Sequence, residues 1–577
     1  MTSIPIPRLP RWKVLAVSNC TPGKAPSGPH ELDKSSFNEV LQKLFPTLFL
    51  TVPDKLEGPQ QHCDINLSFT SLKDFSPDSI LAQVPQCRDL LRFKELINSC
   101  RENRISGADP GASLKNLHIP SSLVSKAFNC IGKKTPSPGN RNSQSGKIDT
   151  ILDMLDVQDT GSSDSQDTGP SGALHELMHA ISGEGQAGIA GRDIRPILEE
   201  TDTCIVSQLN EIIHAPAFIE LETAWRELKF LVDRIDFRRG VELDLIACAK
   251  EDIQKTLYDK VFHPVWKGGH TPFDLIIISH PFGRTPPDQE LLERLAELAQ
   301  STQTLIAAAA SPRFFDAQSY FTLAGEVPSI ASLMDGPGYE NWRAFRDCPE
   351  SDWTAMTAGC FPLRNFYGKN TKPVKTVDYS EPVEWSGLPL ANGSIAAGAL
   401  LVKVMTCLAA GNIDDIRRQA SLHNMEPVPV KTRSGKVSSL TTAAAWTNDM
   451  QWEMADNGLM PLSCPTDSTD AVFGSTTTVR KDGVSAAKAL LSARMSHIVL
   501  ALTGKHGDEN PDSLAQILQA GAQAAFIPES LRSQDTGIAV AVTPGKEKAS
   551  SHEFTISVKL PSPVFGEDIA FEIAFTL

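Results

Sequence analysis

The sequence lacks the features that would place the chain in a membrane or on a nucleic acid. No apolar run approaches the ~20 residues that a membrane-spanning helix needs, and the N-terminus, MTSIPIPRLPRWK, has no apolar signal-peptide core. Positive charge is scarce, since 54 lysines and arginines stand against 69 aspartates and glutamates. Nucleic acids and anionic membrane surfaces attract basic faces. We therefore expect no nucleic-acid partner and no direct membrane insertion.

Paired cysteines are missing as well. The 11 cysteines include no C-x-x-C pair, and an odd number without such spacing predicts reduced, mostly buried thiols in a cytoplasmic protein. Hydrophobic residues make up 41% and charged residues 21% of the 577 residues. This composition is ordinary for a globular protein of about two to four domains.

The stretch NEIIHAPAFIELETAWRELKFLV, residues 210–232, predicts two amphipathic helices. Pro216 separates them, because proline has no amide donor and clashes with the preceding turn. The apolar stripes are Ile205, Leu209, Ile212 and Ile213 before the proline and Leu221, Trp225, Leu228 and Val232 after it. Periodicity alone indicates no more than a pair of core helices.

The residue identities in this stretch resemble a family signature. They match the pattern H-x-P-x-F-x-x-L-E-x-x-W-R-x-L of the large sheath subunit of the type VI secretion system. The matching residues are His214, Pro216, Phe218, Leu221, Glu222, Trp225, Arg226 and Leu228.

A second resemblance lies upstream, in the segment FTSLKDFSPD. Pro77 suits the first position of a helix, where its missing amide costs nothing, and Asp78 is favoured in the first turn. The segment resembles the D-F-S-P-D region of the small sheath subunit of the same system, through Phe69, Leu72, Asp74, Phe75, Ser76, Pro77 and Asp78. In that family the two subunits are usually separate chains, so the resemblance implies a natural fusion.

An acidic tether is expected between the two parts. Between residues 151 and 200 there are ten acidic residues and two arginines, a net charge of 2 − 10 = −8, and residues 135–146 (TPSPGNRNSQSG) read as a linker. We therefore expect a small-subunit-like domain at 1–131, a tether at 132–200 and a large-subunit-like region at 201–577. The last is expected to hold an α/β core at about 201–380 and a further domain at about 381–577.

The core is predicted to be of the α/β class, a mixed α+β sheath-type fold with several domains. Strands are predicted at 241–248, 273–279 and 305–310, and helices at 251–257 and 288–302. This β-α-β order predicts a parallel sheet within the mixed sheets.

Three further segments resemble pieces of the large subunit. They contain Pro312 with Phe315, then Trp342 with Arg346, and later the S-A-R-M run at 492–495. The segment 360–368 fits the family pattern in part, since its first arginine is absent. The long helix expected after Ser496 is predicted to be cut short by TGKHGDENPD.

A literal H-E-x-x-H, His175 to His179, is the sharpest enzymatic alternative. On a helix, two histidines at this spacing could bind zinc, with Glu176 as a general base. The motif lies in the expected tether, however, where little supports a helix or a dry cavity. We therefore treat His175 and His179 as weak metal candidates and expect no catalytic residue and no cofactor.

The resemblance implies a structural protein of the bacterial cytoplasm that assembles into a helical sheath around an inner tube. It implies contraction that expels the tube, attachment to a baseplate and recycling by an ATP-driven unfoldase. The unfoldase usually grips a helix near the large subunit's N-terminus, which is internal here. Two alternatives remain: a baseplate or cap component that does not polymerise, and a zinc-dependent hydrolase.

The C-terminal residues alternate with period two, which predicts strands over 554–560 and 569–577. The simpler interpretation is a β-hairpin within its own domain. The alternative is that this tail or the strand at 13–18 joins a neighbour's sheet, as exchanged strands do in the family. The candidate inter-subunit residues are Val14, Val17, Ile569, Phe571, Ile573 and Phe575.

Overall fold

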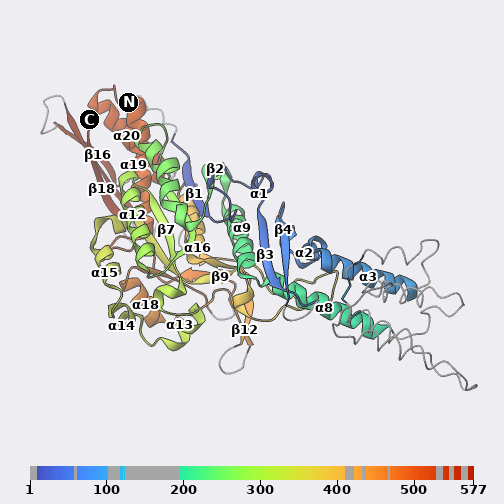
Figure 1. Ribbon diagram of the computed structural model, residues 1–577. Helices are drawn as coiled ribbons and strands as arrows, with labels where there is room; N and C mark the ends of the chain where they lie inside the picture. The colour runs from blue at the N-terminus through green and yellow to red at the C-terminus, as the bar shows by residue number, and fades with distance from the viewer. Residues whose placement is uncertain are drawn as a thin grey trace, which may run out of the picture.

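A computed structural model gives the fold of the chain (Figure 1). It describes residues 9–56, 61–101, 117, 119–120, 123, 194–409, 421–431, 437–465, 468–527, 537–544, 551–560 and 569–577. Most of the expected tether lies outside these residues. Among the described helices, none is long and apolar enough to cross a membrane.

A nine-stranded sheet forms the centre of the molecule, in the spatial order β11-β15-β14-β8-β7-β6-β1-β5-β2. The strands from β14 to β5 run parallel, as the β-α-β pattern predicted, and antiparallel strands at both edges make the sheet mixed. The strands are β1 (Trp12–Ser18), β2 (Ser27–Glu31), β5 (Val241–Ala247), β6 (Leu275–Phe282), β7 (Leu305–Ala310), β8 (Thr354–Ala358), β11 (Ser421–Leu422), β14 (Leu459–Ser463) and β15 (Ala471–Phe473).

The first strand lies in the middle of this sheet. Val14 pairs with Leu243 of β5 on one side and with Leu275 of β6 on the other, and Val14 and Val17 are fully buried. Both edges of β1 are therefore occupied within the chain, so the expectation that Val14 and Val17 join a neighbour's sheet is wrong. The strand also belongs to the sheet of the 201–577 region rather than to a separate domain at 1–131.

Helices cover both faces of the sheet. One face packs against α9 (Pro216–Arg234) and α16 (Gly393–Ala409), and the other against α10 (Ile253–Leu257), α12 (Pro286–Thr302) and α18 (Asn448–Asp456). Gly398 lets α16 approach β6 closely, because a Cβ there would lie 2.3 Å from Ile277 Cδ1. Since α16 covers β6 and β7 and β14 pairs with β8, the core expected to end near residue 380 continues at least to residue 463.

Short elements complete this region. Four helices lie on the α12 side of the sheet or follow its strands: α11 (His263–Trp266), α13 (Tyr320–Glu326), α14 (Ile330–Asp335) and α15 (Glu340–Asp347). Two small antiparallel sheets consist of β9 (Cys360–Pro362) with β10 (Leu390–Asn392) and of β12 (Val428–Lys431) with β13 (Val437–Leu440).

The small-subunit-like segment packs against α9 and shares its apolar core. It contains α1 (Phe37–Leu44), the hairpin β3 (Thr47–Pro53) and β4 (His62–Ser68), α2 (Pro77–Gln83) and α3 (Pro85–Arg101). Figure 1 shows α3 running beside α8 (Arg195–Ile213) as the two helices extend away from the sheet. Because α8 begins at Arg195, the last residues of the expected tether are helical.

The C-terminal residues form a separate layer with its own apolar cluster. Helices α19 (Ala486–His506) and α20 (Pro511–Phe526) pack with a sheet of β16 (Ile538–Pro544), β17 (His552–Leu560) and β18 (Ile569–Thr576). Helix α19 ends at His506, within the TGKHGDENPD segment that was predicted to cut it short. The tail forms a hairpin, with Phe554 stacked on Phe575 at 5.2 Å between ring centroids.

Candidate functional site

The junction between the two family-like segments is the candidate site. Pro216 stands at the first position of α9, three residues after α8 ends at Ile213, so the predicted break between the two helices is confirmed. His214 occupies the turn, where its Nδ1 lies 3.1 Å from the carbonyl oxygen of Asn210. The side chains of α9 then point into a core that both segments share.

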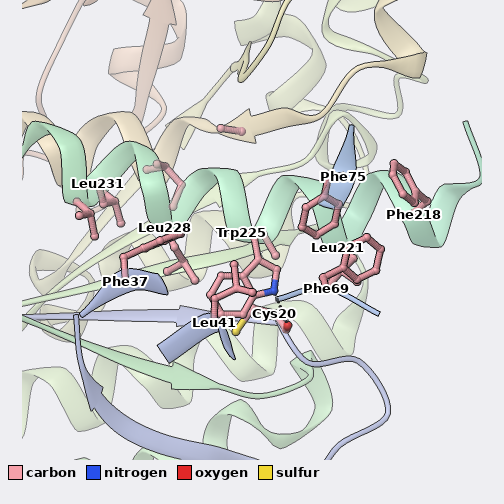
Figure 2. Close-up of a cluster of buried hydrophobic side chains, with 14 of the residues drawn as sticks. Cys20, Phe37, Leu41, Phe69, Phe75, Phe218, Leu221, Trp225, Leu228 and Leu231 are labelled. Atoms are coloured by element: carbon pink, nitrogen blue, oxygen red, sulfur yellow. Dashed lines mark hydrogen bonds between the residues drawn. The ribbon is translucent and has the colours of Figure 1, made fainter. Parts of the chain in front are cut away.

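Aromatic contacts fill this shared core (Figure 2). The Trp225 indole N–H donates to the carbonyl oxygen of Cys20 at 2.9 Å, and its ring meets Phe37 edge-on at 6.0 Å. Phe75 stacks on Phe69 at 4.1 Å, and both rings contact Phe218. Cys20, Phe37, Phe69 and Phe75 belong to the N-terminal part, so the two signatures contact one another directly.

A buried cluster of alternating charges lies at the other side of α9. The Glu222 carboxylate accepts from Arg226 at 2.7 Å and from Arg364 at 3.1 Å. Arg364 is fully buried and donates its other nitrogens to Glu381 at 2.7 and 3.1 Å. His214 Nε2 lies 3.2 Å from the same Glu381. Three signature residues are therefore joined to a loop more than a hundred residues away.

Electrostatics keep this cluster charged. Burial alone would lower the pKa of the Arg364 guanidinium, but the Glu222 and Glu381 carboxylates raise it above its ordinary value. Burial raises the pKa of Glu381, yet hydrogen bonds from His214 and Arg364 hold that pKa below its usual range. The pairs compensate one another where water is excluded, which is the condition for a tolerated buried charge.

The D-F-S-P-D segment builds the start of α2. Burial raises the pKa of Asp74, but hydrogen bonds from the Thr70 and Ser71 backbone lower it below its ordinary value. Pro77 stands at the first helical position, as predicted, and Ser76 caps the helix. Asp78 reaches further than expected, since its carboxylate accepts from the backbone N–H of Thr376 at 2.9 Å across the junction.

The remaining signature residues lie on the α12 side of the sheet. Pro312 starts a short 3-10 turn after β7, and Trp342 packs edge-on against Phe314 at 5.1 Å. Trp342 Nε1 donates to the Asn457 carbonyl at 3.1 Å, and Arg346 Nε donates to the Val479 carbonyl at 3.1 Å. Trp342 and Arg346 thereby join α15 to the backbone at Asn457 and Val479, which is a packing role.

Two further sets of candidate residues were predicted from the sequence, one in the C-terminal tail and one in the H-E-x-x-H motif. The four tail candidates lie on β18, where Ile569 is buried and Phe571, Ile573 and Phe575 are half-buried along one face. The other edge of β18 pairs with no strand among the described residues. His175 and His179 lie outside the described residues, and the described part contains no group of histidine, cysteine and carboxylate side chains that could hold a metal.

One buried polar cluster escaped the sequence analysis. Asp274 Oδ1 lies 3.0 Å from His497 Nδ1, and His497 Nε2 lies 3.0 Å from the Thr302 carbonyl. Arg494 donates to the Arg11 carbonyl at 3.1 Å and stacks over Trp12. The signal was an arginine and a histidine inside the apolar run of α19; only their partners, far along the chain, give them a role.

Comparisons with known proteins match this arrangement. The family model described as "EvpB/VC_A0108, tail sheath N-terminal domain" matches residues 196–480. The model described as "Type VI secretion system, VipA, VC_A0107 or Hcp2" matches residues 27–109. The chain belongs to the type VI secretion sheath family. It is a fusion in which small- and large-subunit segments share one polypeptide.

Two individual matches are of different strength. The type VI secretion system sheath protein TssC1 of Pseudomonas aeruginosa is 24% identical over 331 residues, which cover 53% of this chain and 66% of that protein. A chain in the cryo-EM structure of the anti-feeding prophage baseplate, 6-fold symmetrised, is 13% identical, with a TM-score of 0.31 over 62% of this chain and 77% of that one.

Proposed function

We propose that this sheath fusion polymerises into a helical tube around an inner tube and contracts to expel it. The observation that carries the proposal is the shared core, in which Trp225 of the large-subunit segment packs against Cys20 and Phe37 of the N-terminal part. One chain thereby supplies the pair of subunits as a single building block, with an effective concentration that no separate pair reaches.

This function requires no active site. The work of contraction comes from two packings of the same subunits that differ in free energy, so the relevant features are interfaces and a rigid body between them. The doubly covered sheet and the buried ion cluster at Arg364 provide such a body. We assign no catalytic role to any residue of this chain.

The proposed partners are further copies of the chain, an inner-tube protein, a baseplate and an unfoldase for recycling, in the bacterial cytoplasm. The edge of β18 is proposed to pair with a neighbour, since backbone pairing supplies affinity and alternate side chains supply register. Ile569, Phe571, Ile573 and Phe575 would then set the register from their place on the inner face of the strand.

Electron microscopy of negatively stained particles tests the proposal, after expression of the chain with its neighbouring genes. Tubes with a regular helical repeat are expected. Discrete rings or caps that never elongate would indicate a baseplate component instead. The hydrolase alternative is tested separately by elemental analysis and by replacing His175 and His179 with alanine, which should leave tube formation unchanged and reveal no bound zinc.

A further inference from the structure

A buried polar cluster joins the C-terminal layer (α19, α20 and β16 to β18) to the amino edge of the parallel strands. At this edge β1 begins at Trp12, β6 begins directly after Asp274, and α12 ends at Thr302 just before β7. Helix α19 lies against the edge and directs Arg494 and His497, one turn apart, toward it. We call Asp274, Arg494 and His497 the latch.

Hydrogen bonds keep the Asp274 carboxyl ionised. Its Oδ2 accepts from the backbone N–H of Lys13 at 2.8 Å and lies 3.5 Å from Arg494 Nη1, while its Oδ1 lies 3.0 Å from His497 Nδ1. Burial raises the pKa of Asp274, but the Arg494 charge and the His497 hydrogen bond hold that pKa below its ordinary value. Asp274 is therefore an acceptor with no proton to donate.

The ring of His497 faces an acceptor on each side. Its Nδ1 meets the Asp274 carboxylate, and its Nε2 lies 3.0 Å from the carbonyl oxygen of Thr302. A neutral imidazole offers one donor and one acceptor, whereas an imidazolium offers two donors. A neutral ring would direct a lone pair at one of these oxygens, in a place where His497 is only 6% exposed. The geometry thus fits the doubly protonated ring.

The charged groups around His497 come from its own helix and from two strands. Helix α19 supplies Arg494, the start of β6 supplies Asp274, and the start of β1 supplies Arg11 and Lys13, while the end of α12 contributes uncharged threonines. The two β1 cations reach other partners, a glutamate and a threonine at the surface. The latch therefore holds one carboxylate against two buried cations, a surplus of one positive charge.

We propose that His497 is a protonation switch that fixes the C-terminal layer on the central sheet. With two protons the ring bonds α19 both to Asp274 and to the end of α12. With one proton it keeps a single bond, and the loss of the surplus charge lets the cluster exist in this form as well. The layer has its own apolar cluster, so it can loosen while the sheet stays folded. Rising pH should therefore loosen α19.

Nuclear magnetic resonance of the unassembled full chain, with nitrogen-15 in its histidine rings, tests the protonation directly. Both ring nitrogens carry a proton in an imidazolium, and only one does in a neutral ring. The signal of His497 is the one that His497→Gln removes. It should show two protonated nitrogens at about pH 6 and one at about pH 8.5, a range that spans the ordinary titration of histidine.

Hydrogen exchange followed by mass spectrometry tests the loosening. Protection of the α19 backbone amides, corrected for the intrinsic exchange rate, should fall about tenfold over the same pH range, as expected for one buried hydrogen bond lost. In His497→Gln it should change less than about twofold, because glutamine does not titrate. Glu227 is present in both proteins, so its own titration cancels in the comparison. His506→Gln is the matched control, since that side chain lies on the same helix, is 35% exposed and should leave the wild-type profile unchanged.

A His497 ring that carries one proton throughout this range, or two protons throughout, overturns the switch. A wild-type exchange profile of α19 that runs parallel to that of His497→Gln overturns it too. Should His497→Gln fail to fold, the wild-type exchange decides alone, because the loss of protection in α19 should exceed that in α9, where Glu227 lies. Both measurements use the unassembled chain, so they decide this inference whether or not the chain forms tubes.

Discussion

The indole N–H of Trp225 donates to the carbonyl oxygen of Cys20, 205 residues earlier in the chain, at 2.9 Å. This bond joins the signature helix α9 to the loop that follows the central strand β1. The tryptophan is fully buried, so its ring contributes packing as well as the bond.

Trp225→Ala should therefore lower the free energy of unfolding by about 3–5 kcal/mol, through the cavity it leaves and the unpaired carbonyl. Chemical denaturation of the purified chain measures the change. Trp452→Ala is the matched control, since that ring is 70% exposed and its loss should change stability by no more than about 0.5 kcal/mol. Equal effects at the two positions would contradict the assigned burial.

Cutting the chain between residues 140 and 170, at an inserted protease site, should leave the two pieces associated. The reason is the shared core, together with the hydrogen bond that the Thr376 backbone N–H donates to Asp78 and the ion pair of Lys94 with Asp202. Gel filtration in mild buffer measures the association. Pieces that separate under these conditions would show that the fusion is a tether between independent domains.

Arg364→Ala should lower the free energy of unfolding by about 3–5 kcal/mol, because Glu222 and Glu381 would stay buried without a counter-charge. Lys369→Ala is the control at an exposed pair, where side chains of Lys369 and Asp378 are 73% and 61% exposed, and it should cost at most about 1 kcal/mol. Denaturation curves of both variants give the comparison. A mild effect at Arg364 would mean that water enters the cluster.

The buried Glu227 should make the chain lose stability as pH rises from 4.5 to about 8. Burial raises the pKa of this carboxyl from 4.5 to about 8, although Ser279 and Asn392 donate hydrogen bonds to it. The folded state thus binds the proton more tightly than the unfolded state, so this group's contribution is complete below pH 4.5 and is lost as pH rises through about 8.

Denaturation of wild type and Glu227→Gln between pH 5 and pH 9 isolates that contribution. The wild type should lose stability relative to the variant by up to about 1.4 kcal/mol per pH unit over the affected range. The glutamine keeps an acceptor for Ser279 and cannot ionise. Parallel pH profiles of the two proteins would show that Glu227 is already ionised in the folded chain.

Deletion of residues 567–577 should lower the melting temperature markedly. These residues include β18, which pairs with β17 from Glu553 to Leu560 and stacks Phe575 on Phe554. Differential scanning calorimetry measures the loss, and tube formation is scored in parallel. An unchanged melting temperature together with a loss of tubes would show that β18 serves the neighbour rather than its own domain.

The sequence by itself determined the local structure and the family. The break at Pro216, the stripes of α8 and α9, the start of α2 at Pro77 and the parallel β-α-β order all depend on neighbours within a few residues, which periodicity and proline placement reveal. The signatures at 74–78 and 214–228 indicated the two sheath segments, because they combine residue types that periodicity alone does not require.

Only the tertiary structure decided which distant segments meet. Nothing near residues 12–18 indicates that this strand enters the sheet between β5 and β6, and nothing near Asp78 indicates a bond to Thr376, 298 residues away. The same holds for Arg364, since the sequence does not indicate that this arginine lies between the Glu222 and Glu381 carboxylates in the folded chain. Pairing over such separations depends on the global packing of apolar faces, and the same local pattern is compatible with many partners.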